Sequence, residues 1–141
     1  VLYRGYVQQQ LAARFRAPLV WMVVPNLLFA AVHWQDGALP IDNWQYVIWA
    51  FCFGLAASDL TARSGNLGPA IGFHLANNAY AFLCFGEAGG PDSGLALFLF
   101  PASSGLPDPI VTDAPLISLQ LGIELATIGL AWLAVRIAIR R

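Results

Sequence analysis

PLISLQLGIELATIGLAWLAV, residues 115–135, contains one charged side chain, that of Glu124, in a mainly apolar run. A helix needs about 20 mainly apolar residues to cross the hydrocarbon core of a bilayer, so this run has the length of a membrane span. Three other runs of similar length and composition precede it, at residues 18–34, 44–60 and 66–87. We therefore predict an all-α fold, a polytopic transmembrane helical bundle.

The composition of the chain also indicates a membrane protein. Of its 141 residues, 58% are hydrophobic and only 11% are charged, whereas a soluble domain carries about 25% charged residues. The net charge of −1 argues against a basic surface for nucleic acid. Cys52 and Cys84 lie far apart inside apolar runs and lack the CxxC spacing of metal or redox sites. We expect both to be free thiols.

The segments outside the four apolar runs complete the predicted topology. Residues 1–17 have helical composition, with Arg4 and Gln8 on one face, and form a partial first helix. Residues 88–114 are rich in Gly, Pro, Ser and Asp and form one long loop. If the chain changes side at each span, every Arg outside the first helix falls on the same side. Because Arg collects on the cytoplasmic side, we predict about four full spans plus the partial helix, with a cytoplasmic C-terminus.

Ionisable and amide side chains interrupt the predicted membrane segments. Arg4 lies in LYRGY, His33 closes FAAVH, and HLANN contains His74 and Asn78. Because His74 and Asn78 are four residues apart, they share one helix face. Such groups are costly inside a bilayer unless they are paired, and they are candidates for a functional site.

Spacing alone leaves several roles open for these side chains. Polar residues of membrane helices often hydrogen-bond to neighbouring helices, which is the role expected for Asn77. Glu124 is expected to be protonated and packed, or to pair with Arg4 or a His. The two histidines and an Asn would suit a hydrolytic site that stabilises an oxyanion. Two histidines would also suit bis-histidine haem ligation, in a haem-binding or quinone-handling membrane subunit.

Three short motifs occur in an order that is typical of a known family. Phe29 to His33 matches FxxxH, His74 to Asn78 matches HxxxN, and Arg4 in VLYRGYVQQQL matches the Arg of EExxxR. With FAAVH and GPAIGFHLANN in place, the chain resembles the CPBP family of intramembrane proteases. This is the CAAX-processing and bacteriocin-processing group, also called Abi.

The resemblance implies a catalytic role for each matching residue. A glutamate of the first motif would activate water for attack on a peptide carbonyl, and Arg4 would orient that glutamate. His33 and His74 would hold the water or a metal, and Asn78 would stabilise the oxyanion. Two His and one Glu would suit a catalytic zinc, whereas a water activated directly by Glu needs no metal. Both mechanisms stay open.

The expected protein is an intramembrane endopeptidase of the bacterial cytoplasmic membrane, with the lipid bilayer and a peptide or protein substrate as partners. The resemblance covers roughly residues 1–85. It implies that residues 1–141 are the C-terminal part of a single protease domain, whose glutamate pair precedes Val1. This segment by itself is therefore expected to be inactive. The alternatives are the haem-binding subunit and a non-catalytic relative that acts as a membrane scaffold or immunity protein.

Overall fold

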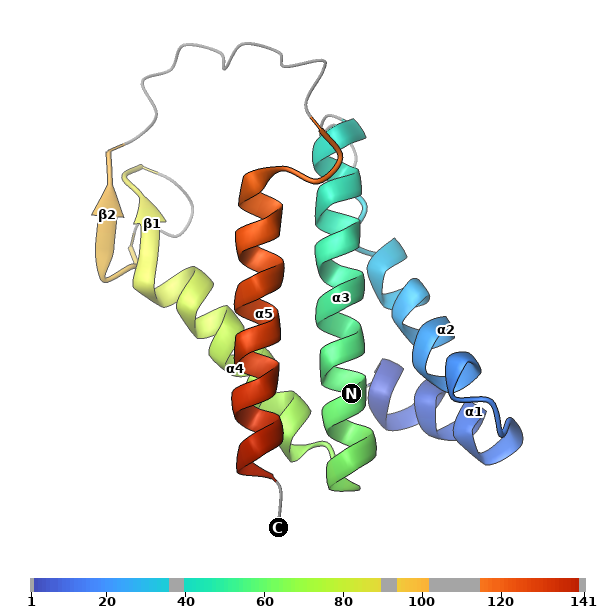
Figure 1. The fold of residues 1–141 in the computed structure, drawn as a ribbon. Coiled ribbons are helices and arrows are strands. Elements are labelled where there is room, and N and C mark those ends of the chain that lie inside the picture. The colour runs from blue at the N-terminus through green and yellow to red at the C-terminus, as the bar shows by residue number, and fades with distance from the viewer. Residues whose placement is uncertain (1, 36–39, 90–93, 102–114, 140–141) are drawn as a thin grey trace. The chain divides into compact units, whose positions relative to one another are not determined.

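A computed structural model describes residues 2–35, 40–89, 94–101 and 115–139 of the chain (Figure 1). It is mainly helical, as predicted. The chain forms two compact units, one of Val1–Ile71 with Ala114–Arg141 and one of Gly72–Asp113, and each is described by itself. The single domain over the whole chain stays a prediction. The elements, including two π-helical segments η1 and η2, are η1 (Leu2–Val7), α1 (Gln8–Arg14), α2 (Pro18–Ala31), α3 (Pro40–Ser64), α4 (Gly68–Ala79), η2 (Tyr80–Cys84), β1 (Phe85–Glu87), β2 (Phe98–Phe100) and α5 (Leu119–Ala138).

Helix α3 is the central helix of the first unit, and α2 and α5 both pack against it (Figure 1). Its buried face carries Ala50, Phe53, Ala57 and Leu60, each of which is at most 1% exposed. These residues follow one another at spacings of three and four, which places them on a single helix face. The apolar run predicted over 44–60 therefore forms the core of this unit.

Local sequence sets the ends of the helices. Pro18 begins α2, where its missing N–H is tolerated because the first turn has no intrahelical partner for it. The Ser118 hydroxyl caps α5 by accepting the N–H of Leu121 at 3.1 Å. Gly65 ends α3 with φ +69°, and its N–H donates to the carbonyl of Thr61 at 3.0 Å. This left-handed cap suits Gly, which lacks a Cβ.

The second unit contains most of α4, the π-helical turn η2 and a two-stranded parallel sheet. Strands β1 and β2 pair from Phe85 opposite Phe98 onwards. The helix predicted over 66–87 therefore stops its α-helical course at Ala79, and part of the loop predicted over 88–114 is a strand. Strand β2 consists of Phe98, Leu99 and Phe100, whose side chains favour extended structure, and its pairing with β1 satisfies backbone groups of both strands.

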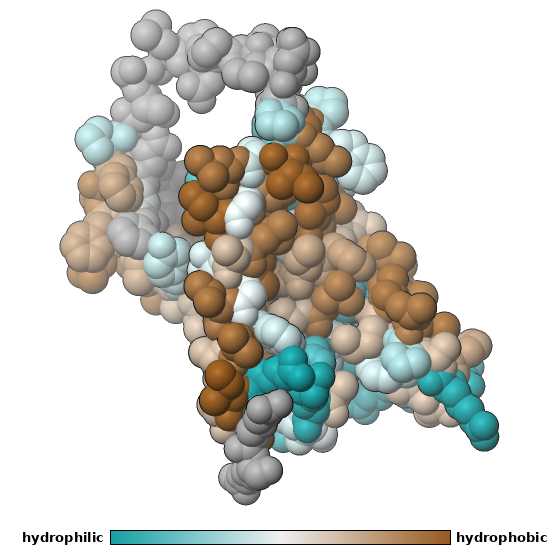
Figure 2. Space-filling view, in the orientation of Figure 1, coloured by the Kyte–Doolittle hydropathy of each residue, from teal (hydrophilic) through white to brown (hydrophobic). Residues whose placement is uncertain are grey.

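Among the described residues, α5 is the one helix that is long and apolar enough to cross a membrane, and only 11% of its most apolar window is buried. Figure 2 shows hydrophobic surface along it. The predicted count of four full spans is not confirmed. Helix α2 is apolar but has 14 residues, and at ~1.5 Å per residue it falls short of a ~30 Å hydrocarbon core. Helix α3 has 25 residues but carries Asp42, Asp59 and Arg63.

Candidate active site

Arg4 lies in the π-helical turn η1 and is buried, with 7% of its surface exposed. The central carbon of its guanidinium is 4.7 Å from the centre of the Phe29 ring, which is a cation–π contact. Within the described part of the chain, its Nε and Nη2 atoms have no hydrogen-bond partner. Because a buried charge is costly unless it is paired, this guanidinium is suited to hold an anion such as a carboxylate.

His33 lies just after the end of α2, and the backbone fixes its ring. Its Nδ1 is 2.6 Å from the carbonyl oxygen of Phe29, and since a carbonyl can only accept, Nδ1 carries the proton. The backbone N–H of His33 donates to Ala30 at 3.0 Å instead, which leaves the Phe29 carbonyl for the ring. When the ring carries only this proton, Nε2 is the nitrogen that can accept a hydrogen bond or bind a metal.

The ring of Phe29 joins Arg4 to His33. Besides the Arg4 contact, its centre is 4.5 Å from that of the His33 ring. Tyr3 meets Phe29 edge-on, and Tyr46 meets His33 edge-on, each with ring centres 5.5 Å apart. Residues four apart on a helix are neighbours, so the FxxxH spacing brings the two rings together. The first unit thus unites two of the four predicted catalytic residues on one aromatic side chain.

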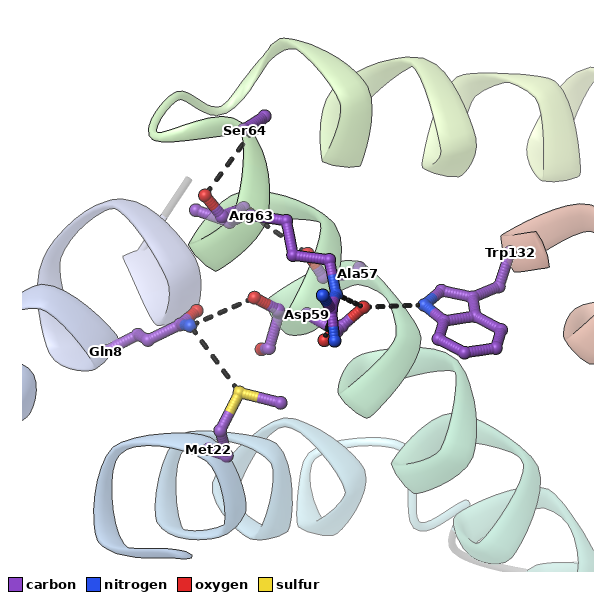
Figure 3. Close-up of polar contacts among 9 residues, drawn as sticks. Gln8, Met22, Ala57, Asp59, Arg63, Ser64 and Trp132 are labelled. Carbon is purple, nitrogen blue, oxygen red and sulfur yellow. Dashed lines mark hydrogen bonds and ion pairs between the residues drawn. The ribbon is translucent and has the colours of Figure 1, made fainter. Parts of the chain in front are cut away.

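A buried network of amide and hydroxyl side chains links α1, α2 and α3. One of its residues, Gln8, is four residues after Arg4 in the sequence. Nδ2 of Asn26 donates to Ser58 Oγ at 2.8 Å and to the Met22 carbonyl at 2.7 Å. Nε2 of Gln8 donates to the Ser58 carbonyl at 3.1 Å, and Figure 3 shows the Gln8 side chain extending to α3 with Met22 beside it. Asn26 is 0% and Gln8 3% exposed. Because Gln8 follows Arg4 by one turn, the network anchors the helical segment that carries Arg4.

The sequence predicted Gln8 on the face of Arg4, but the roles of Asn26 and Ser58 were not predicted. Two signals could have found them: an amide directly after Pro25 in an apolar run, and a hydroxyl in the small-residue segment LAASDL. Neither signal tells which helices meet. That information lies in the packing of α2 on α3.

His74 and Asn78 lie on α4, in the part that belongs to the second unit. Their spacing of four places them on one face of that helix, as predicted, and both are half-buried. The neighbouring Asn77 is also half-buried. The four predicted site residues are therefore distributed over the two units, as one pair (Arg4 and His33) in the first and another pair (His74 and Asn78) in the second.

The other titratable side chains of the described residues form no metal-binding group with these two pairs. The described residues contain no group of three His, Cys, Asp or Glu that could hold a metal. Cys52 and Cys84 are free thiols, as predicted. Glu124 accepts a hydrogen bond from Nε2 of Gln120 at 2.7 Å, one turn away on α5. The expected protonation of Glu124, or its pairing with Arg4 or a His, stays a prediction.

Comparison with known proteins identifies the family of the chain. A family model described as type II CAAX prenyl endopeptidase, Rce1-like, matches residues 1–80, which is more than half of the chain. The matched segment contains all four predicted catalytic residues. Comparisons with curated proteins and with solved structures found no match. The resemblance to CPBP proteases is confirmed by the family match, and the chain belongs to the Rce1-like family of type II CAAX prenyl endopeptidases, a family of integral membrane proteases.

Proposed function

We propose that the chain forms the histidine-bearing part of an intramembrane endopeptidase, which hydrolyses a peptide bond of a membrane-associated substrate by attack of water. One observation carries the proposal: Arg4 and His33 both rest on Phe29, the guanidinium at 4.7 Å and the imidazole at 4.5 Å from its ring centre. This arrangement brings a group that can orient a carboxylate close to a group that can hold a water molecule. Hydrolysis by a carboxylate-activated water needs both.

Arg4 is the proposed partner of the glutamate that activates the water. Its guanidinium is buried, and two of its nitrogens lack a partner among the described residues. A carboxylate would satisfy both, and Arg forms strong bidentate pairs with carboxylates. In EExxxR the second glutamate stands four residues before the Arg, on the same helix face. The proposed glutamates therefore precede Val1.

The position of the proton on the His33 ring indicates different roles for the two histidines. Since Nδ1 of His33 donates to the Phe29 carbonyl, the neutral ring can only accept at Nε2. We assign His33 to hold the attacking water through Nε2 while the glutamate takes the proton of that water. Donation to the oxyanion of the tetrahedral intermediate then falls to His74 and to the Asn78 amide, which share one face of α4.

We also propose, as the alternative mechanism, that the site binds a divalent metal. Two imidazoles and a carboxylate are a common ligand set of catalytic zinc, and a ligating His often donates its second ring N–H to a backbone carbonyl, as His33 does. We propose His33, through Nε2, and His74 as the ligands. When bound, zinc would supply Lewis-acid polarisation of the peptide carbonyl. Metal analysis of the purified protein before and after dialysis against a chelator, with cleavage assayed on the same samples, tests this part.

The natural full-length protein, assayed in detergent with internally quenched peptides, tests the proposal as a whole. His33→Ala and His74→Ala are expected to lower kcat by at least about 100-fold, the usual contribution of a group that handles the reacting proton or water. Val32→Ala is the matched control, because Val32 precedes His33 and is 66% exposed. If His33→Ala cleaves as fast as Val32→Ala, and both fold, the assignment of His33 is wrong.

A further inference from the structure

An apolar groove runs between α3 and α5 within the first unit and contains none of the proposed catalytic residues. Its volume of about 420 Å³ is within the ~300–1,000 Å³ range of small-ligand sites. Met22 of α2 also lines it. Ala56 of α3 and Gly129 of α5 are two of its small lining residues. A Cβ on Gly129 would meet no atom within 4 Å. The groove therefore has room for a slender apolar chain.

The polar side chains of the groove, Asp59 and Trp132, are bound to each other. Nε1 of Trp132 donates to a carboxylate oxygen of Asp59 at 3.0 Å. Nε of Arg63 donates to both oxygens of the same carboxylate, at 2.8 and 2.9 Å (Figure 3). The guanidinium of Arg136 lies over the Trp132 ring, 4.9 Å from its centre. Two positive groups thus stand against one carboxylate, and this end of the groove has a net positive charge.

We propose that the groove binds one acyl chain of an anionic phospholipid, with its phosphate held by Arg63 and Arg136. The Arg63 side chain is 46% exposed. Among the described residues its hydrogen bonds run through Nε, which leaves its terminal nitrogens for a phosphate oxygen. Guanidinium groups match phosphate geometry well. Figure 2 shows a hydrophilic patch beside the C-terminal end of α5, next to the hydrophobic surface of the helix.

The chemistry of the groove favours a lipid chain over a peptide. A peptide would place N–H and C=O groups against apolar walls, where an unpaired backbone group costs several kcal/mol. The carboxylate and the indole N–H that line the groove already satisfy each other. An acyl chain has no polar group to satisfy. Helix α5, which forms one wall, is also the described helix with the length and composition to cross a membrane.

Trp132 provides a direct readout, because brominated acyl chains quench a nearby indole. The full-length protein is reconstituted in phosphatidylcholine vesicles that contain an equal mole fraction of brominated phosphatidylglycerol or brominated phosphatidylcholine. The difference in quenching between wild type and Trp132→Phe isolates Trp132 from the other tryptophans. We expect stronger quenching by the anionic lipid. Arg63→Gln and Arg136→Gln should each reduce this preference about fivefold, the factor given by about 1 kcal/mol per basic residue at an anionic lipid.

Two glycine substitutions on α5 separate occupancy of the groove from contact with bulk lipid. Gly129→Leu fills the groove and should abolish the preferential quenching of Trp132. Gly122→Leu is the matched control, because a Cβ there also meets nothing within 4 Å and Gly122 does not line the groove. Equal quenching by the two lipids in wild type, or unchanged quenching in Gly129→Leu, overturns the proposal. A farnesylated peptide that displaces the brominated lipid would instead identify a substrate groove and also overturns it. None of these readouts depends on peptide cleavage.

Discussion

Gly54 on α3 lies where α2 comes so close that a side chain has no room. A Cβ at this position would be 2.5 Å from Oδ1 of Asn26 and 3.2 Å from a ring carbon of Phe29. Asn26 cannot move aside freely, since its amide nitrogen makes two short hydrogen bonds in a fully buried position. We therefore predict that Gly54→Ala destabilises the first unit and shifts Phe29, the ring on which Arg4 and His33 rest.

The size of the effect follows from three terms. Overpacking a buried contact costs about 1–3 kcal/mol, and disturbing the hydrogen bonds of Asn26 adds about 1 kcal/mol. Replacing Gly by Ala inside a helix returns about 1 kcal/mol. The expected net loss in the free energy of unfolding is about 1–3 kcal/mol. Gly122→Ala on α5 is the control, because a Cβ there meets no atom within 4 Å, and it should gain up to about 1 kcal/mol.

Denaturant titration followed by far-UV circular dichroism, in one detergent, measures both variants against wild type. The two substitutions make the same chemical change on helices of one unit, but only the one at Gly54 creates a steric clash. The denaturation midpoint should therefore fall for Gly54→Ala and rise for Gly122→Ala. The peptide-cleavage rate of full-length Gly54→Ala should also fall by at least about tenfold, because a small displacement of catalytic groups has large effects on rate. A midpoint for Gly54→Ala at or above that of Gly122→Ala would refute the close-approach argument.

Two further substitutions probe the ring contact itself. Arg4→Met keeps an unbranched apolar stem over Phe29 but removes the buried charge. The free energy of unfolding of residues 1–141 should therefore stay equal or rise by about 1 kcal/mol, while cleavage by the full-length protein falls by at least about 100-fold. A large loss of stability would show that the charge of Arg4 stabilises the fold. Phe29→Leu removes the aromatic face between Arg4 and His33, and we expect a loss of about 1–3 kcal/mol in unfolding with kcat reduced about tenfold. Unchanged kcat in Phe29→Leu would show that the ring does not position the site.

The sequence predicted the location of the helices because hydrophobic runs are a local property. The runs over 18–34, 44–60 and 115–135 overlap α2, α3 and α5. Span number was harder to predict, since an apolar run can be longer than the helix that it forms. The run over 18–34 contains a helix of only 14 residues. The run over 66–87 changes from α-helix to a π-helical turn and then to a strand, and that strand is stabilised by a partner distant in sequence.

The amide network shows why part of the site was not predictable. Asn26 and Ser58 are 32 residues apart, and Gln8 and Ser58 are 50 apart. Each is unremarkable in its own segment, since single Asn, Gln and Ser residues are common in membrane helices as links between neighbours. Their contact depends on the approach of α2 to α3 at Gly54, where the missing Cβ leaves space for the Asn26 side chain. A glycine in a helix does not by itself indicate which neighbour comes close.

The FxxxH motif, in contrast, can be explained within one helix end, and this explains why a short pattern is informative. The spacing of four brings the imidazole onto the Phe29 ring and brings Nδ1 of His33 to the Phe29 carbonyl. Phe29 thereby sets both the orientation and the tautomer of His33, because its backbone oxygen accepts a hydrogen bond from Nδ1. Its ring also accepts the guanidinium of Arg4 from another segment. An aliphatic residue at position 29 would preserve the carbonyl contact but not the cation–π contact, so the aromatic ring is what couples the first motif to the second.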